Sequence, residues 1–197
     1  MRERIRLFLT FVAILTLVLA TTASASSSVT HDPSGDSSAE PYTDIAMAKV
    51  TAQAGRDVLY FQMGLAGSVP LTPSRPGRYD GFTAYNWLID TDGNGIANYV
   101  VVVRFCSHLV QGPCVGDEWH WESALTEPST GRRIAGFDFE IADNVVKGFV
   151  PVSQLGDPSA FRWIGATRTS PSSSNLPSVD IAPDLLSGSP VWVEFAR

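Results

Sequence analysis

The feature that most constrains the fold is a two-residue alternation of apolar and polar side chains, which recurs in short runs from Pro41 onward. This period places successive side chains on opposite faces of a β-strand, and turn-forming residues separate the runs. Beyond the first 25 residues, no segment shows convincing helical periodicity. The expected strands are Asp44–Ala52, Asp57–Leu65, Tyr85–Ile89, Tyr99–Phe105, Glu118–Glu122, Arg133–Ile141, Val145–Val150, Ala160–Thr167 and Val191–Phe195. Many short strands of this kind predict an all-β chain folded as an antiparallel two-sheet β-sandwich, either jelly-roll or immunoglobulin-like.

Two positions interrupt the alternation. In Arg133–Ile141 the pattern slips around Gly136, which predicts a β-bulge within one strand. The segment Val150–Gly156, V-P-V-S-Q-L-G, predicts a short turn or a single helical turn before the next strand.

The N-terminus has the composition of an export signal. A positive segment, Met1–Arg6, precedes an apolar run, Leu7–Ala20, and small residues near Ala25 supply a cleavage site. The apolar run is shorter than a membrane span normally needs, although an uncleaved anchor is the alternative. We therefore predict a signal peptide over residues 1–25, a disordered linker over the polar residues 26–40, and one folded domain over residues 41–197 of a secreted, extracellular protein.

Net charge narrows the range of partners. Removing residues 1–25 leaves 14 − 3 = 11 basic and 20 − 1 = 19 acidic residues, a net charge of −8. Phosphate backbones and anionic membrane surfaces would repel such a chain, so nucleic acid is not an expected partner. No second apolar stretch is long enough to span a membrane after signal cleavage. The oligomeric state stays open.

The hairpin Y-N-W-L-I-D-T-D-G-N-G-I is the sequence's candidate cation site. Asp90, Asp92 and Asn94 place oxygen side chains at alternate positions, and the Ile96 carbonyl could add a fourth ligand of the kind that calcium prefers. Asp180 or Asp184 could complete the shell. The loop is not an EF-hand, because Val101 stands where the bidentate glutamate belongs. The alternative is a glycine-rich turn without metal, which Asp and Asn also favour.

Cys106 and Cys114 are the only cysteines of the chain. In an exported protein such a close pair predicts a disulfide that closes a small loop after the Tyr99–Phe105 strand. A zinc site with His108 and His120 has no recognisable ligand spacing.

Catalytic motifs are absent from the sequence, so we expect a binding protein and not an enzyme. Glu118, His120 and Glu122 could form an acid/base cluster, but a solvated polar strand face explains them more simply. Trp87 and Trp163 share faces with apolar residues and should be core. Exposed aromatic rings that could stack on sugars are expected at three positions: Trp192, Trp119 and Trp121.

Four motifs in order resemble the secreted β-sandwich domains related to family 9 carbohydrate-binding modules and DOMON-like domains. They are D-I-x-M-x-x-V, W-L-I-D-T-D-G-N-G, V-P-V-S-Q-L-G followed by F-R-W, and the closing D-I-A-P-D. The resemblance implies a jelly-roll-like sandwich that binds calcium in some members and sugar in others. We therefore expect an exported, calcium-stabilised, non-catalytic module with a polysaccharide or cell-surface glycan as ligand. A cell-surface protein-interaction or structural module, and a hydrolase of unrecognised type, are the alternatives.

Overall fold

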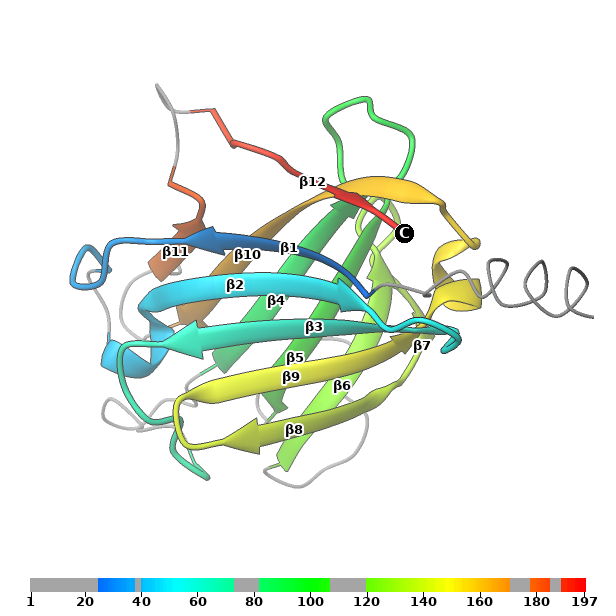
Figure 1. The fold of residues 1–197 in the computed structure, drawn as a ribbon. Helices are drawn as coiled ribbons and strands as arrows, with labels where there is room; N and C mark the ends of the chain where they lie inside the picture. The colour runs from blue at the N-terminus through cyan, green and yellow to red at the C-terminus, as the bar shows by residue number, and fades with distance from the viewer. Residues whose placement is uncertain (1–24, 38–39, 73–81, 107–119, 171–177, 185–188) are drawn as a thin grey trace, which may run out of the picture.

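The computed structural model describes residues 25–37, 40–72, 82–106, 120–170, 178–184 and 189–197. They form two antiparallel sheets that pack face to face, which confirms the all-β, two-sheet sandwich (Figure 1). The first sheet has the order β1 (Ser26–His31), β2 (Ile45–Ala52), β3 (Val58–Leu65), β9 (Val145–Pro151), β8 (Asp138–Ala142). The second has the order β11 (Ser178–Ala182), β10 (Ala160–Ser170), β4 (Phe82–Asp90), β5 (Tyr99–Cys106), β6 (His120–Glu127), β7 (Arg132–Ala135), and β12 (Val193–Ala196) pairs with β10.

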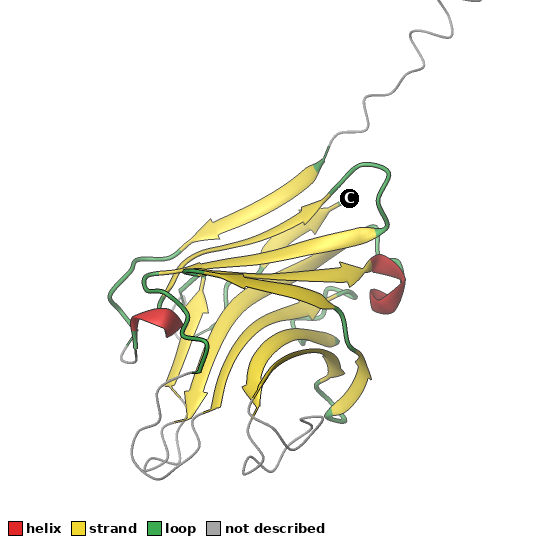
Figure 2. Ribbon diagram, turned by 90° about the horizontal axis from the view of Figure 1, so that it is seen from below, coloured by secondary structure: helices red, strands yellow, loops and turns green. Residues whose placement is uncertain are grey.

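Only two short 3-10 helices occur among the described residues, η1 (Pro41–Thr43) and η2 (Val152–Leu155), drawn in red in Figure 2. The helical turn expected within V-P-V-S-Q-L-G is therefore confirmed. It ends at Gly156, whose φ of 79° suits a residue without a Cβ atom. None of the helices in the described part of the chain is long and apolar enough to cross a membrane.

The core lies between the two sheets and is built from the alternating positions of the strands. On β4, Tyr85, Trp87 and Ile89 are fully buried, as the sequence pattern predicted. Trp87 meets Phe61 of the opposite sheet, with 5.8 Å between the ring centroids. Trp163 on β10 is also fully buried, so both tryptophans expected in the core are confirmed there.

The segment expected to be a disordered linker begins with a strand. Residues Ser26–His31 form β1, which pairs with Met47–Ala52 of β2 at the edge of the first sheet. An edge strand needs backbone hydrogen bonds from one neighbour and little apolar burial, so a polar composition does not prevent it. Ser28 also accepts a hydrogen bond of 2.7 Å from the Trp163 indole N–H. The first sheet therefore includes Ser26–His31, which precede the expected domain start at Pro41.

The prediction that Arg133–Ile141 forms one continuous strand is wrong. The slip at Gly136 is the point where the chain leaves the second sheet, after β7, and enters the first sheet as β8. The Phe137 N–H donates to Ser123 Oγ at 3.0 Å and fixes this crossing. A change of sheet and a bulge both interrupt the two-residue period, so the sequence pattern alone could not separate them.

Several predictions fall on residues that the structure does not describe. These are residues 1–24 of the signal peptide, His108, Cys114, Glu118 and Trp119. The disulfide therefore stays a prediction.

Candidate metal centre

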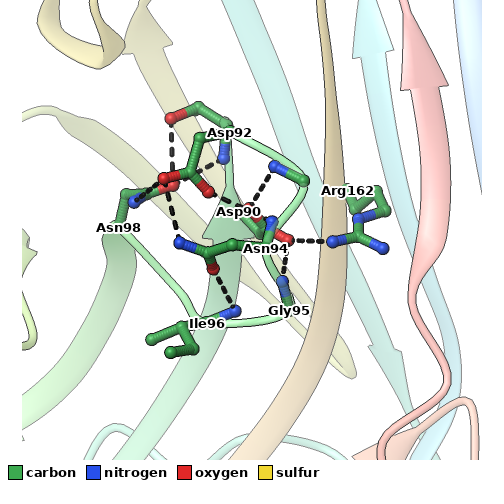
Figure 3. A network of polar contacts seen from close by, with 9 residues as sticks. Asp90, Asp92, Asn94, Gly95, Ile96, Asn98 and Arg162 are labelled. Carbon is green, nitrogen blue, oxygen red and sulfur yellow. Dashed lines mark hydrogen bonds and ion pairs between the residues drawn. The ribbon is translucent and has the colours of Figure 1, made fainter.

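The hairpin between β4 and β5 forms a closed hydrogen-bond network (Figure 3). Asp90 is fully buried, and its Oδ1 accepts the Gly93 N–H at 2.7 Å while its Oδ2 accepts the Gly95 N–H at 2.9 Å. Arg162 of β10 forms an ion pair with the same Oδ2 atom. Both glycines have positive φ angles, 77° and 85°, which turn their N–H groups inward. The carboxylate of Asp90 is thus satisfied without a cation.

These contacts also set the proton affinity of Asp90. Burial alone would raise its pKa, but hydrogen bonds from Gly95, Arg162 and Gly93 outweigh burial and lower the pKa to about 2. The positive charge of Arg162 would repel a second cation at this carboxylate.

The side-chain oxygens of Asp92 and Asn94 are occupied in the same way. Asp92 Oδ1 accepts the Asn94 N–H at 3.2 Å, and Asp92 Oδ2 accepts the Asn94 side-chain amide at 3.0 Å. Asn94 Oδ1 accepts the Ile96 N–H at 2.7 Å. Side-chain oxygens that bond the backbone two residues onward form Asx-turns, which need no metal. The geometry therefore favours the turn interpretation of this loop.

Asp180 and Asp184 do not complete the hairpin site. Asp90 lies opposite Arg162 on β10, whereas Asp180 lies opposite Thr167, five residues farther along the same strand. At about 3.4 Å per residue, this places the two aspartates roughly 17 Å apart along the sheet. In Figure 1 the hairpin rises at the top, while β11 lies at the left beside the loop that follows β1.

At this left-hand edge the fold gathers five carboxylates, which we call the aspartate cluster: Asp32, Asp36, Asp44, Asp180 and Asp184. They form two triads that share Asp36. In the first, Asp32, Asp36 and Asp184 each bring one carboxylate oxygen within 4.8 Å of the others. In the second, Asp36, Asp44 and Asp180 do the same.

Two members of the cluster are buried with oxygens that lack a hydrogen-bond partner. Asp32 is 8% exposed, and neither of its carboxylate oxygens accepts a hydrogen bond. Asp44 is 6% exposed; its Oδ2 accepts the Gly35 N–H at 2.7 Å, but its Oδ1 has no partner. A buried carboxylate oxygen without a donor is energetically costly, so such an atom indicates that something else satisfies it.

The pKa values of Asp32 and Asp180 are both raised, as expected for buried carboxylates that lie close to one another. Burial, followed by the neighbouring carboxylates of Asp180, Asp184 and Asp36, raises the pKa of Asp32 to about 7. The backbone N–H of Asp184 lowers the pKa of Asp32 in part, although it forms no hydrogen bond with either carboxylate oxygen. Burial also raises the pKa of Asp180, although the N–H groups of Ile45 and Ile181 bond its oxygens at 2.6 and 2.9 Å.

Local structure explains why these residues meet. Asp32 follows β1 directly, and its N–H bonds the Ala46 carbonyl at 3.2 Å. Asp44 ends η1, and the Tyr85 hydroxyl anchors that helix by donating to the Tyr42 carbonyl at 2.9 Å. Asp180 lies within β11, and Asp184 follows it after the Ala182–Pro183 bond. Three chain segments thus supply one acidic site.

Sequence reasoning missed most of this site. Asp32 and Asp36 belong to D-P-S-G-D, a segment interpreted as linker, and Asp44 was assigned to a strand. The two segments D-P-S-G-D and D-I-A-P-D are both short, acidic and rich in turn-forming residues. That shared character was the available signal.

The expected aromatic platform gains no support from the described residues. The Trp121 indole N–H donates to the Leu71 carbonyl at 3.0 Å, and its ring stacks on Tyr85 with centroids 5.8 Å apart. Trp192 is half-buried, and the guanidinium of Arg162 lies 5.7 Å from its ring centroid. Both rings are engaged in contacts within the protein.

The expected solvated face around Glu122 is wrong for that residue. Glu122 is buried and forms ion pairs with Arg104 and Arg133, the latter at 3.2 Å. His120 Nε2 lies 3.9 Å from the same carboxylate. Two guanidinium groups contact the Glu122 carboxylate, which is the pattern of a structural ion-pair network.

Comparison with known proteins adds no relative. The chain matched no family model, no curated protein and no solved structure.

Proposed function

We propose that this protein is an exported, non-catalytic β-sandwich module that binds calcium at the aspartate cluster. The observation that carries the proposal is a pair of buried carboxylates within the cluster. Both oxygens of Asp32 and the Oδ1 atom of Asp44 have no hydrogen-bond donor. A divalent cation would replace the mutual repulsion of these groups with attraction.

The donor set favours calcium among biological cations. The cluster offers carboxylate oxygens and no nitrogen or sulfur, which suits a hard cation and disfavours zinc or copper. Its ligands come from three separate segments and from both buried and exposed positions. Such irregular shells suit calcium, whereas magnesium requires near-octahedral geometry and keeps more of its water.

The proposed role of this site is to stabilise the module when calcium is bound. The ion would join the loop after β1, the start of β2 and the end of β11, which belong to different sheets. Extracellular calcium modules bind with dissociation constants of about 10⁻⁴–10⁻³ M. With such an affinity, the exported protein would be fully stabilised only where the calcium concentration is in the millimolar range.

Carbohydrate binding stays part of the proposal as the leading ligand class, and it rests on the resemblance alone. A polysaccharide retention panel, run in calcium and in chelator, tests it. Retention in calcium would support a glycan-binding module. Failure to retain any polysaccharide would favour the protein-interaction or structural alternative.

The cation itself is tested by calorimetric titration of chelator-treated protein with calcium chloride and with magnesium chloride. We expect calcium to bind, magnesium to bind far more weakly, and Asp180→Asn to weaken calcium binding at least tenfold. Asp92→Asn is the matched control, because it removes the same charge from the hairpin, and it should bind calcium as the natural protein does. The reverse pattern, with loss of binding in the Asp92 variant alone, would move the site to the hairpin.

A further inference from the structure

We infer that the aspartate cluster holds two divalent cations, bridged by the carboxylate of Asp36. This inference rests on the proposed function. It adds the number of ions, the division of the ligands between them and the role of one residue.

The first argument is the geometry of the two triads. Oxygens bound to calcium lie about 2.3–2.6 Å from the ion, so two ligands of one ion are at most about 5 Å apart. Each triad satisfies this limit, since its oxygens lie within 4.8 Å of one another. The five residues do not form one such group; they divide into Asp32 with Asp184 and Asp44 with Asp180, and Asp36 belongs to both pairs. One central ion would leave part of the cluster unbound.

The second argument is that each triad has its own buried, unsatisfied carboxylate. Asp32 supplies two unpartnered oxygens to the first triad, and Asp44 supplies its unpartnered Oδ1 to the second. Both side chains are more than nine-tenths buried. A single ion held by one triad would leave the buried oxygen of the other triad without a partner.

The third argument is charge. With all five carboxylates ionised, the cluster carries a charge of −5; one divalent cation leaves −3, whereas two leave −1. Carboxylates at this separation in a partly buried site repel one another strongly. Neutralisation therefore favours the second ion, and a carboxylate shared between two cations is the natural bridge.

The two positions differ in how well they are preorganised. In the second triad, Asp44 and Asp180 are buried and oriented by the N–H groups of Gly35 and Ile45. In the first, only Asp32 is buried, while Asp36 and Asp184 are exposed. Fixed ligands lose less freedom on binding, so the second triad should fill at the lower calcium concentration.

The test is a count of bound ions by equilibrium dialysis, with calcium measured by atomic emission and protein by absorbance. The natural protein should bind two calcium ions per chain. Asp184→Ala, an exposed change that spares the core, should leave one tightly bound ion. Asp44→Asn should leave one weaker ion, and Asp36→Asn should weaken both ions at least tenfold. Asp92→Asn should still bind two.

The outcomes separate this inference from the proposed function. One ion per chain in the natural protein, removed equally by Asp184→Ala and Asp44→Asn, would overturn the bridged pair and leave the calcium module standing. No bound calcium at all would overturn both. Circular dichroism of each variant in millimolar calcium confirms that the counted chains are folded.

Discussion

The hairpin and the aspartate cluster are both acidic and both include a glycine-containing turn, yet their carboxylates have opposite surroundings. In the hairpin, each oxygen of Asp90 has an N–H donor, and Arg162 supplies a positive charge. In the cluster, both oxygens of Asp32 lack donors, and the neighbours are other carboxylates. The pKa of Asp90 is accordingly lowered to about 2, while that of Asp32 is raised to about 7.

The difference shows what distinguishes a candidate metal site from a turn of similar composition. The number of carboxylates in a segment is less informative than the donors that reach them. A backbone that folds its own N–H groups onto a carboxylate leaves little for a cation to improve. At Asp32, tertiary structure brings other carboxylates close without bringing a donor to either oxygen, and that arrangement favours an ion.

The largest effect should come from the hairpin, through stability and independently of calcium. Asp90→Ala removes the acceptor of Arg162 and of two backbone N–H groups in a buried site. We expect a loss of about 3–5 kcal/mol in the free energy of unfolding, measured by urea denaturation. The double variant with Arg162→Met should recover part of this loss. A loss below about 1 kcal/mol would mean that the network contributes little.

The next effect should have the opposite sign. In the presence of chelator at pH 7.5, Asp32→Asn removes one of several mutually repelling charges, so the variant should be more stable than the natural protein by about 2 kcal/mol. The same variant should respond less to added calcium. Thermal melts in chelator and in millimolar calcium measure both effects. A lower melting temperature of the variant in chelator would contradict unrelieved repulsion at the cluster.

The pH dependence should separate the two regions. Asp32 has a folded pKa of about 7, above its ordinary value of 3.8, so between these pH values the folded state binds a proton that the unfolded state releases. Calcium-free stability should therefore fall as the pH rises from 5.5 to 7, by about 1–2 kcal/mol in total. Asp90 contributes the reverse, because its stabilisation is present above pH 3.8 and is lost as the pH falls through 2.

Urea denaturation at a series of pH values measures this dependence. Saturating calcium should abolish the decline, since the bound ions require ionised carboxylates. A calcium-free stability that is constant from pH 5.5 to 7 would indicate that Asp32 is already ionised or satisfied.

The smallest effect should come from Asp92→Ala. Asp92 is exposed, and its hydrogen bonds lie within the turn. We expect a loss of at most about 1 kcal/mol in urea denaturation, with the calcium dependence of the melting temperature unchanged. A loss of that calcium dependence would reinstate the hairpin as a cation site.

The parts of the fold that the sequence predicted are those determined by neighbouring residues. Two-residue alternation located β2, β3, β4 and β5 to within a few residues. It could do so because the alternating apolar side chains of each strand determine which of its faces is buried. Strand β1 was missed because its neighbour β2 supplies the backbone hydrogen bonds that order it, and Ser28 gains its partner from Trp163. The change of sheet at Gly136 likewise depends on Ser123, which comes earlier in the chain.

The candidate site follows the same rule. Asp90, Asp92 and Asn94 were found because they are close in sequence, but whether N–H groups would reach them was not visible in the pattern. Asp32 and Asp184 are 184 − 32 = 152 positions apart. They meet only because the two sheets pack together where the Ile45 N–H of β2 bonds Asp180 of β11. No local spacing rule covers such a distance.

Strand β1 has a consequence for the order in which the molecule assembles. The residues that follow it, Asp32 and Asp36, are synthesised long before their partners Asp180 and Asp184. The aspartate cluster therefore cannot form until β11 and Asp184 have been synthesised. Contacts of such high sequence separation slow folding, because the loop between them must close first. Calcium bound at the aspartate cluster would therefore act only after β11 has been synthesised and has joined the second sheet.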